Sequence, residues 1–127
     1  MTIYFLMGHS AHIPLLLFHF IMAIIANKLL RQTQTKQEEA AEIDQKLSRM
    51  EDDIRKLKID FDIYFNGASK RPPLEARARL EAYIKRISDN RNLTYAQRYL
   101  FNTLVARFVS YRELWRRNLK AKGEELI

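Results

Sequence analysis

The three histidines, His9, His12 and His19, are the side chains of this sequence best suited to chemistry near neutral pH. His12 and His19 are seven residues apart, which places them two turns apart on one face of a helix, about 10 Å along its axis. A histidine in a membrane helix can bind haem or chlorophyll, or relay protons. It can equally hydrogen-bond to a neighbouring backbone and serve packing alone. His12 and His19 are therefore the candidate cofactor ligands, with packing as the alternative.

No other residues have the spacing of a catalytic or metal site. The sequence contains no cysteine, which excludes thiolate zinc sites, disulfides and cysteine nucleophiles. Asp60 and Asp62 lie on opposite sides of a hydrophobic run, and neither a phosphate-binding glycine loop nor a nucleophile elbow is present. We therefore expect no enzymatic activity, no metal and no resident cofactor, with haem or chlorophyll at the histidines as the alternative.

Cations and aromatic residues alternate in the last third of the chain. Arginine can bind phosphate with two parallel hydrogen bonds, and aromatic rings can stack on bases. However, Tyr99, Phe108, Tyr111 and Trp115 have the spacing of a helix core, and cation–π pairing within the fold needs no ligand. Specific RNA- or DNA-binding motifs are absent, so a nucleic-acid partner rests on charge alone. Five arginines are predicted to form a basic partner surface: Arg91, Arg98, Arg112, Arg116 and Arg117.

The net charge of +7 is unevenly distributed along the sequence. Residues 1–27 contain no Lys, Arg, Asp or Glu, and residues 28–60 contain 8 basic and 8 acidic side chains. Residues 61–127 contain 14 basic and 7 acidic side chains, so the whole excess lies there. This half should attract phosphate, acidic lipid or an acidic protein surface.

The uncharged N-terminal segment is predicted to be a membrane anchor. Residues 3–26 carry no formal charge, and crossing a bilayer core takes about 20 apolar residues. The nine Leu, Ile and Phe residues between positions 13 and 26 contribute roughly −3 to −5 kcal/mol to insertion. No basic region precedes the apolar run and no small-residue cleavage site follows it, which favours an anchor over a secretory signal.

The cations Lys28, Arg31 and Lys36 follow this span, so the positive-inside rule places the N-terminus outside and the remaining chain in the cytoplasm. We expect the bacterial inner membrane. Two alternatives stay open: a helix buried against another subunit, or an N-terminal extension from a misassigned start codon, with Met7 and Met22 as in-frame candidates.

Residues 40–66 show the strongest periodicity in the chain, with apolar side chains alternating at spacings of three and four. This pattern is typical of a coiled coil. A single helix cannot bury such a stripe, so it must pair with a copy of itself, with another protein or with the helices that follow. The predicted oligomer interface is Ile43, Leu47, Met50, Ile54, Leu57 and Phe61.

Residues 67–122 are predicted to form a basic hairpin of two helices that packs on the end of the coiled coil. Asn66-Gly67 ends the preceding helix, and Pro72-Pro73 precedes a short helix from Leu74 to Ile87. Thr94 and Gln97 match a capping box, followed by a helix to near Ala121. Its predicted inward stripe is Ala96, Leu100, Leu104, Phe108, Tyr111, Trp115 and Leu119.

The predicted fold is therefore all-α, with an N-terminal transmembrane helix, a long coiled-coil helix and a C-terminal basic helical hairpin. The boundaries are 1–29 for the anchor, 30–39 for a juxtamembrane linker continuing into the helix, 40–66 for the coiled coil and 67–122 for the hairpin.

Residues from about 40 to 125 resemble an uncharacterised bacterial domain family, in which a coiled-coil segment precedes a helical hairpin. The resemblance implies this fold and transfers no activity. Members of the family usually look soluble or carry the module at the end of longer chains, and the apolar residues 1–29 depart from that pattern. The matching segments are Leu57-Lys58-Ile59-Asp60, Tyr64-Phe65-Asn66-Gly67, Arg71-Pro72-Pro73, Leu104 to Arg107-Phe108, and Tyr111 with Leu114-Trp115-Arg116-Arg117.

These patterns together favour a non-enzymatic membrane scaffold or accessory subunit of a larger complex. It would associate through its coiled coil, as a homo-oligomer or with other subunits, and dock an acidic partner or the anionic leaflet with its basic hairpin. A nucleic-acid-binding module is one alternative. An accessory subunit of a pigment- or haem-bearing membrane complex, using His12 or His19, is the other.

Overall fold

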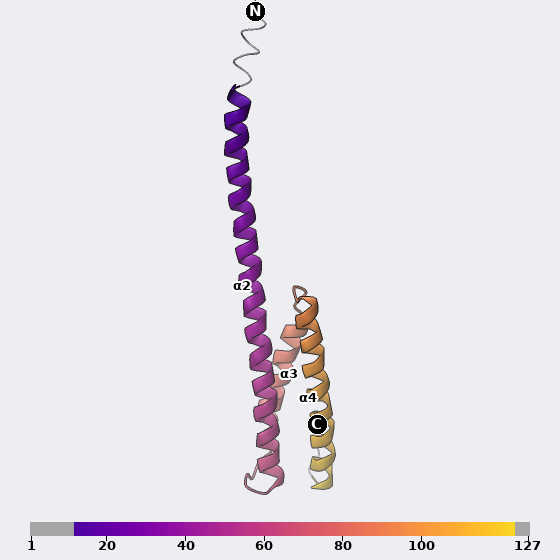
Figure 1. Ribbon diagram of the computed structural model, residues 1–127. Helices are drawn as coiled ribbons and strands as arrows, with labels where there is room; N and C mark the ends of the chain where they lie inside the picture. Colours follow the sequence, from indigo (N-terminus) through magenta and orange to yellow (C-terminus); the bar gives the residue numbers. More distant parts are fainter. Residues whose placement is uncertain (1–11, 124–127) are drawn as a thin grey trace, which may run out of the picture. The chain divides into compact units, whose positions relative to one another are not determined.

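The protein is all-helical over residues 12–123, the part of the chain that the computed structural model describes. Three helices and no strands occur in this range: α2 (His12–Phe65), α3 (Leu74–Ser88) and α4 (Tyr95–Ala121) (Figure 1). The chain divides into two compact units, the first ending at Glu39 and the second beginning at Ala40. The predicted all-α class is confirmed.

The first unit contains the part of α2 before Ala40. Every side chain from Pro14 to Glu39 is exposed, including large apolar ones such as Leu16, at 74%, and Phe20, at 66%. This helix is long and apolar enough to cross a membrane, and none of its apolar window is buried within the chain. Within the residues that the structure describes, the apolar side chains of this unit are therefore uncovered.

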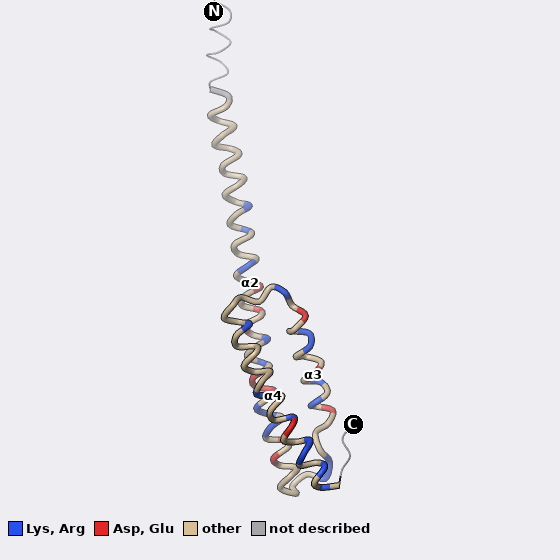
Figure 2. The backbone as a smooth tube through the Cα atoms, turned by 90° about the vertical axis from the view of Figure 1, so that its right-hand side faces the viewer, with Lys and Arg blue, Asp and Glu red and all other residues tan. Residues whose placement is uncertain are grey.

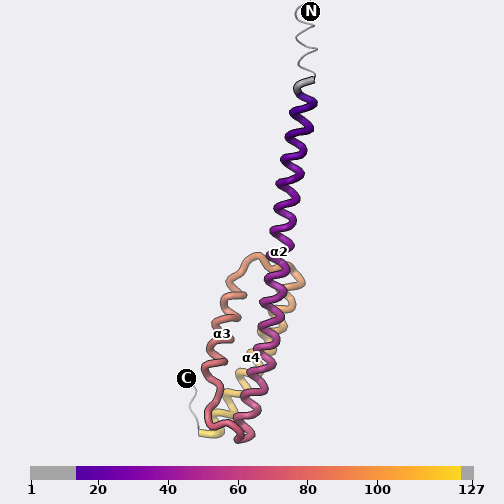
Figure 3. Tube along the Cα trace, turned by 90° about the vertical axis from the view of Figure 1, so that its left-hand side faces the viewer, coloured from indigo at the N-terminus to yellow at the C-terminus, as the bar shows by residue number. Residues whose placement is uncertain are grey.

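The second unit is a bundle of three helices with one core. α3 and α4 lie beside the part of α2 that follows Ala40, and two directions of view agree on this (Figures 1 and 3). The apolar stripe of α2 forms one wall of the core, and the other two helices form the rest. The core side chains are Ile43, Leu47, Met50, Ile54, Leu57, Phe61 and Tyr64 from α2, Leu80 and Ile87 from α3, and Phe101, Leu104, Phe108, Trp115 and Leu119 from α4.

An aromatic cluster fills the end of this core near the α2–α3 loop. The ring of Phe61 stacks on Trp115 with centroids 4.2 Å apart, and the ring of Tyr111 stacks on Trp115 with centroids 5.8 Å apart. Trp115 is only 2% exposed. Aromatic pairs of this kind add to the stabilisation from their buried area, so the cluster ties α4 to α2 firmly at this end.

Local sequence explains where α2 ends. Gly67 adopts a left-handed backbone with φ of 83°, and its N–H donates to Tyr64 O at 3.0 Å. The N–H of Ala68 donates to Ile63 O at 3.1 Å, which completes a Schellman motif. The predicted helix end at Asn66-Gly67 is confirmed. α3 then begins at Leu74, directly after Pro73.

The start of α4 differs from the predicted inward stripe by one residue. The capping box of Thr94 and Gln97 is present, as predicted. Gln97 and Phe101 are buried, whereas Ala96 and Leu100 are exposed. The physical reason is a cross-helix polar contact: the Gln97 amide nitrogen donates to the backbone oxygen of α2's Ala40 at 3.0 Å and to Asp44 Oδ1 at 2.8 Å. An assignment from apolar spacing alone missed this glutamine.

Candidate basic interaction surface

The six residues predicted as an oligomer interface lie in the core of the chain's own helical bundle. Their exposed fractions range from 0% to 4%, because α3 and α4 cover the stripe of α2. In this fold they are not accessible to a second copy, so the interpretation of the stripe as an oligomer interface is replaced by internal packing. The six are Ile43, Leu47, Met50, Ile54, Leu57 and Phe61.

The two candidate cofactor ligands are only partly described. The side chains of His9 and His12 lie outside the described residues. His19 is on α2, where Nδ1 lies 2.8 Å from the carbonyl oxygen of Leu15, one turn earlier. This contact orients the ring along its own helix through one nitrogen. Within the described part of the chain, no group of three His, Asp or Glu residues is arranged to hold a metal ion.

The five predicted surface arginines are all exposed, but they do not form one patch. Arg91 lies in the α3–α4 loop and Arg98 in the first turn of α4. Arg112, Arg116 and Arg117 lie in the second half of α4. Arg98 and Arg112 are separated by 14 residues of helix, or about 21 Å. Two basic clusters therefore exist, one at each end of the bundle.

The cluster at the C-terminal end of α4 has the larger positive charge, because cations from outside the predicted set join it. Figure 2 shows Lys and Arg gathered where the end of α4 meets the α2–α3 loop. Lys122 links the two segments: its Nζ donates to Tyr64 O at 3.4 Å and lies 4.3 Å from the centre of the Tyr64 ring. We call this set the basic pole: Lys70, Arg71, Arg112, Arg116, Arg117, Lys120 and Lys122.

One acidic residue of α4 shapes the basic pole. Glu113 accepts hydrogen bonds from Arg116 Nη2 at 2.6 Å and from Arg116 Nε at 3.1 Å. The bonded guanidinium lowers the pKa of the Glu113 carboxyl, and the carboxyl raises the pKa of Arg116. Both side chains are exposed, so water screens the pair. Arg112 and Arg117 are exposed on the same part of α4.

Charge is segregated between the helices of the second unit. From Ala40 to Phe65, α2 has 5 basic and 7 acidic side chains, whereas α4 has 6 basic and 1 acidic. An ion pair joins the two helices at Arg107 and Glu51, 3.4 Å apart. All six cations of α4 are exposed. This arrangement makes α4 the most electropositive helix of the bundle.

Two exposed tyrosines were missed as surface residues. Tyr95 is 91% and Tyr99 71% exposed, four residues apart at the start of α4. The spacing of Tyr99 from later aromatic residues suggested core packing, and that interpretation is wrong. No local sequence signal corrects it, because Gln97 is in the core through its contacts with Ala40 and Asp44 of α2, and these turn Tyr95 and Tyr99 outward.

Comparison with known protein families, with curated proteins and with solved structures finds no match to this chain. The family resemblance of residues 40–125 therefore stays a prediction from the sequence.

Proposed function

We propose that this protein is a non-enzymatic, single-pass membrane accessory subunit that holds a basic helical bundle at a bacterial inner membrane. The apolar part of α2 would be the anchor, with its N-terminus outside and the bundle in the cytoplasm. The basic pole would dock an acidic surface of a partner protein. Since the stripe of α2 is already covered within the chain, association through that stripe is no longer part of the proposal.

The observation that carries the proposal is the contrast between covered and uncovered apolar surface. The bundle buries its stripe completely, whereas the side chains from Pro14 to Leu30 are all exposed. An apolar surface of this size does not persist in water, because burial is worth about 25 cal/mol for each Å². This part of α2 has no polar face, so its whole circumference needs cover. A lipid bilayer would cover it on all sides.

A nucleic-acid-binding module remains the second candidate, because of one specific feature of the structure. Tyr95 and Tyr99 are exposed in the same part of α4 as Arg98, and exposed aromatic rings beside a cation can stack on bases of a single strand. Tyrosines of this kind also suit the interface of a membrane. Binding of single-stranded nucleic acid that weakens steeply with salt would favour this candidate.

The decisive test uses the full-length chain in its native host. Membranes are washed with alkaline carbonate, solubilised in mild detergent, and the protein is purified with whatever binds it. We expect the chain in the carbonate-resistant pellet and a partner with an acidic surface in the purified complex. Replacing Arg112, Arg116 and Arg117 together by Glu should release that partner.

A matched control is available on α3, where Arg79, Lys85 and Arg86 are also exposed. Their joint replacement by Glu changes the net charge by the same amount and should leave the partner bound. Equal loss with both triple variants would show that binding follows total charge rather than the basic pole. Recovery of the chain in the soluble fraction would refute the anchor.

A further inference from the structure

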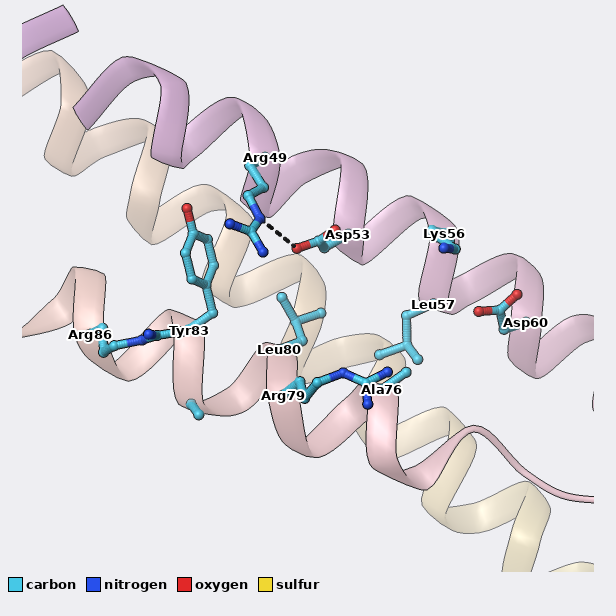
Figure 4. A pocket seen from close by; sticks show the side chains of 11 residues that line it. Arg49, Asp53, Lys56, Leu57, Asp60, Ala76, Arg79, Leu80, Tyr83 and Arg86 are labelled. Atoms are coloured by element: carbon cyan, nitrogen blue, oxygen red, sulfur yellow. Dashed lines mark ion pairs between the residues drawn. The ribbon is translucent and has the colours of Figure 1, made fainter. Parts of the chain in front are cut away.

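A groove of about 440 Å³ lies between α2 and α3, and only residues of these two helices line it. Its floor is apolar, formed by Leu57, Ala76 and Leu80, and its walls carry charged side chains from both helices (Figure 4). The volume falls in the range of sites that hold small organic molecules. This groove shares no residue with the basic pole, so a ligand there is independent of the function proposed above.

Four cations line the groove in two pairs. α2 contributes Arg49 and Lys56, and α3 contributes Arg79 and Arg86, with the two members seven positions apart on each helix. The helices run antiparallel, so Arg49 and Arg86 lie towards one end of the groove, and Lys56 and Arg79 towards the other (Figure 4). Seven residues of helix separate the two ends by about 10 Å.

Few partners within the protein neutralise these cations. Arg49 has Asp53 at 3.7 Å, and both side chains of that ion pair are largely exposed. Over the residues that the structure describes, Lys56, Arg79 and Arg86 form no ion pair. Tyr83 orders the side chains at one end of the groove. Its hydroxyl donates to Lys46 O at 3.1 Å. The guanidinium carbons of Arg49 and Arg86 lie 5.0 Å and 5.5 Å from the centre of its ring.

Two carboxylates, those of Asp53 and Asp60, also line the groove and restrict which anions can enter it. Asp53 projects between the two ends of the groove, and Asp60 lies next to Lys56 (Figure 4). A continuous polyanion such as a nucleic-acid strand would place a phosphate against Asp53 and be repelled. A ligand with separate anionic ends and hydroxyl groups between them would satisfy both the cations and Asp53.

We propose that the α2–α3 groove binds a small ligand with two phosphate groups about 10 Å apart. One phosphate would bind Arg49 and Arg86 beside the Tyr83 ring, and the other would bind Lys56 and Arg79. Arginine recognises phosphate with paired hydrogen bonds, which explains why three of the four cations are arginine. The phosphates can belong to a soluble bisphosphate or to a lipid headgroup with two phosphates.

The test measures binding to the full-length chain in an uncharged detergent by isothermal titration calorimetry. The probes are hexane-1,6-bisphosphate, hexyl phosphate and inorganic pyrophosphate. We expect the bisphosphate to bind with a Kd below about 1 mM and at least about tenfold more tightly than either other probe, since only it spans both ends. Absence of bisphosphate binding, or equal binding of pyrophosphate, would overturn the proposal.

Single substitutions locate the site. Arg79→Ala and Arg86→Ala should each weaken bisphosphate binding about tenfold and remove its advantage over hexyl phosphate, because each removes a cation from one end. Arg55→Ala on α2 and Arg107→Ala on α4 are matched controls outside the groove and outside the basic pole, and each should change the Kd less than about twofold. An equal effect of all four substitutions would mean nonspecific attraction and would contradict the proposed site.

A second arm identifies the source of the phosphates. The same titration is repeated in nanodiscs of phosphatidylcholine, with and without a lipid whose headgroup has two phosphates. If that lipid abolishes binding of the soluble bisphosphate in the wild type, the groove takes the headgroup. If soluble binding persists unchanged, the groove takes a free bisphosphate.

Discussion

The two parts of α2 differ in whether other helices of the chain cover their apolar side chains. From Pro14 to Leu30 the apolar residues surround the helix and all are exposed. From Ile43 to Tyr64 they form one stripe, which α3 and α4 cover until its members are at most 4% exposed. A continuous helix thus changes from a segment that needs outside cover to one that the chain covers itself.

Amphipathicity, rather than hydrophobic content, therefore decides what a helix can pair with. A stripe fits against two neighbouring helices and leaves a polar face in water. A helix that is apolar on every side has to be covered all round, either by the core of a larger protein assembly or by a bilayer. Four predictions test this contrast between the two parts of α2.

The largest effect is expected from charges in the uncovered segment. Replacing Leu17 and Ile21 together by Arg should cost about 5–7 kcal/mol of insertion free energy, from about 2.5–3.5 kcal/mol for each residue. The chain should leave the carbonate-washed membrane pellet. Replacing Gln32 and Gln34 by Arg adds the same charge beyond the apolar segment and should leave the chain in the pellet. A double variant of Leu17 and Ile21 that stays in the membrane would contradict the anchor.

The next largest effect is expected in the covered part. Trp115→Ala empties the centre of the aromatic cluster and should lower the free energy of unfolding of the bundle by about 3–5 kcal/mol. Urea unfolding in detergent, followed by circular dichroism, measures it. Leu16→Ala, at a residue 74% exposed, is the control and should change that free energy by less than about 0.5 kcal/mol. Similar losses for both would mean that the two parts of α2 unfold together.

A smaller effect separates the helix cap from the cross-helix contact. Gln97→Ala removes both the capping box and the hydrogen bonds to Ala40 O and Asp44, so we expect a loss of about 1–3 kcal/mol. Thr94→Ala removes the cap alone and should cost about 1 kcal/mol. The same urea titration compares them. If the two substitutions lower the free energy of unfolding equally, the contacts of Gln97 with α2 do not stabilise the bundle.

The smallest effect concerns pH. The pKa of Glu113 is lowered in the folded protein, so its ionised form favours folding above the pKa of the unfolded chain, and this contribution is lost as the pH falls through the folded pKa. Glu113→Gln should therefore lower the urea midpoint slightly at pH 7, and the difference from the wild type should vanish once the pH lies below the folded pKa. A difference that persists undiminished under acid conditions would mean that packing, not charge, explains it.

Some features of the fold follow from neighbouring residues and were predictable. Gly67 ends α2 because a left-handed position just past the helix favours glycine, and the Thr94–Gln97 pair begins α4 because each satisfies a free N–H of the other. The spacing of three and four located the apolar stripe for the same reason: helical periodicity depends only on positions a few residues apart.

Other features depend on contacts between residues distant in sequence. Gln97 is buried because Ala40 and Asp44 lie opposite it, and this places Tyr95 and Tyr99 in solvent. The α2–α3 groove exists because the antiparallel register brings Arg49 towards Arg86, 37 residues further along the chain.

The helical class, the helix ends, the apolar stripe and the apolar segment could all be read from the sequence, since spacing and caps act over a few residues. That α3 and α4 cover the stripe, while the described side chains of the apolar segment are exposed, emerged only from the folded arrangement. The physical reason is that burial depends on which surfaces meet, and a sequence pattern marks a face as apolar without naming what lies against it.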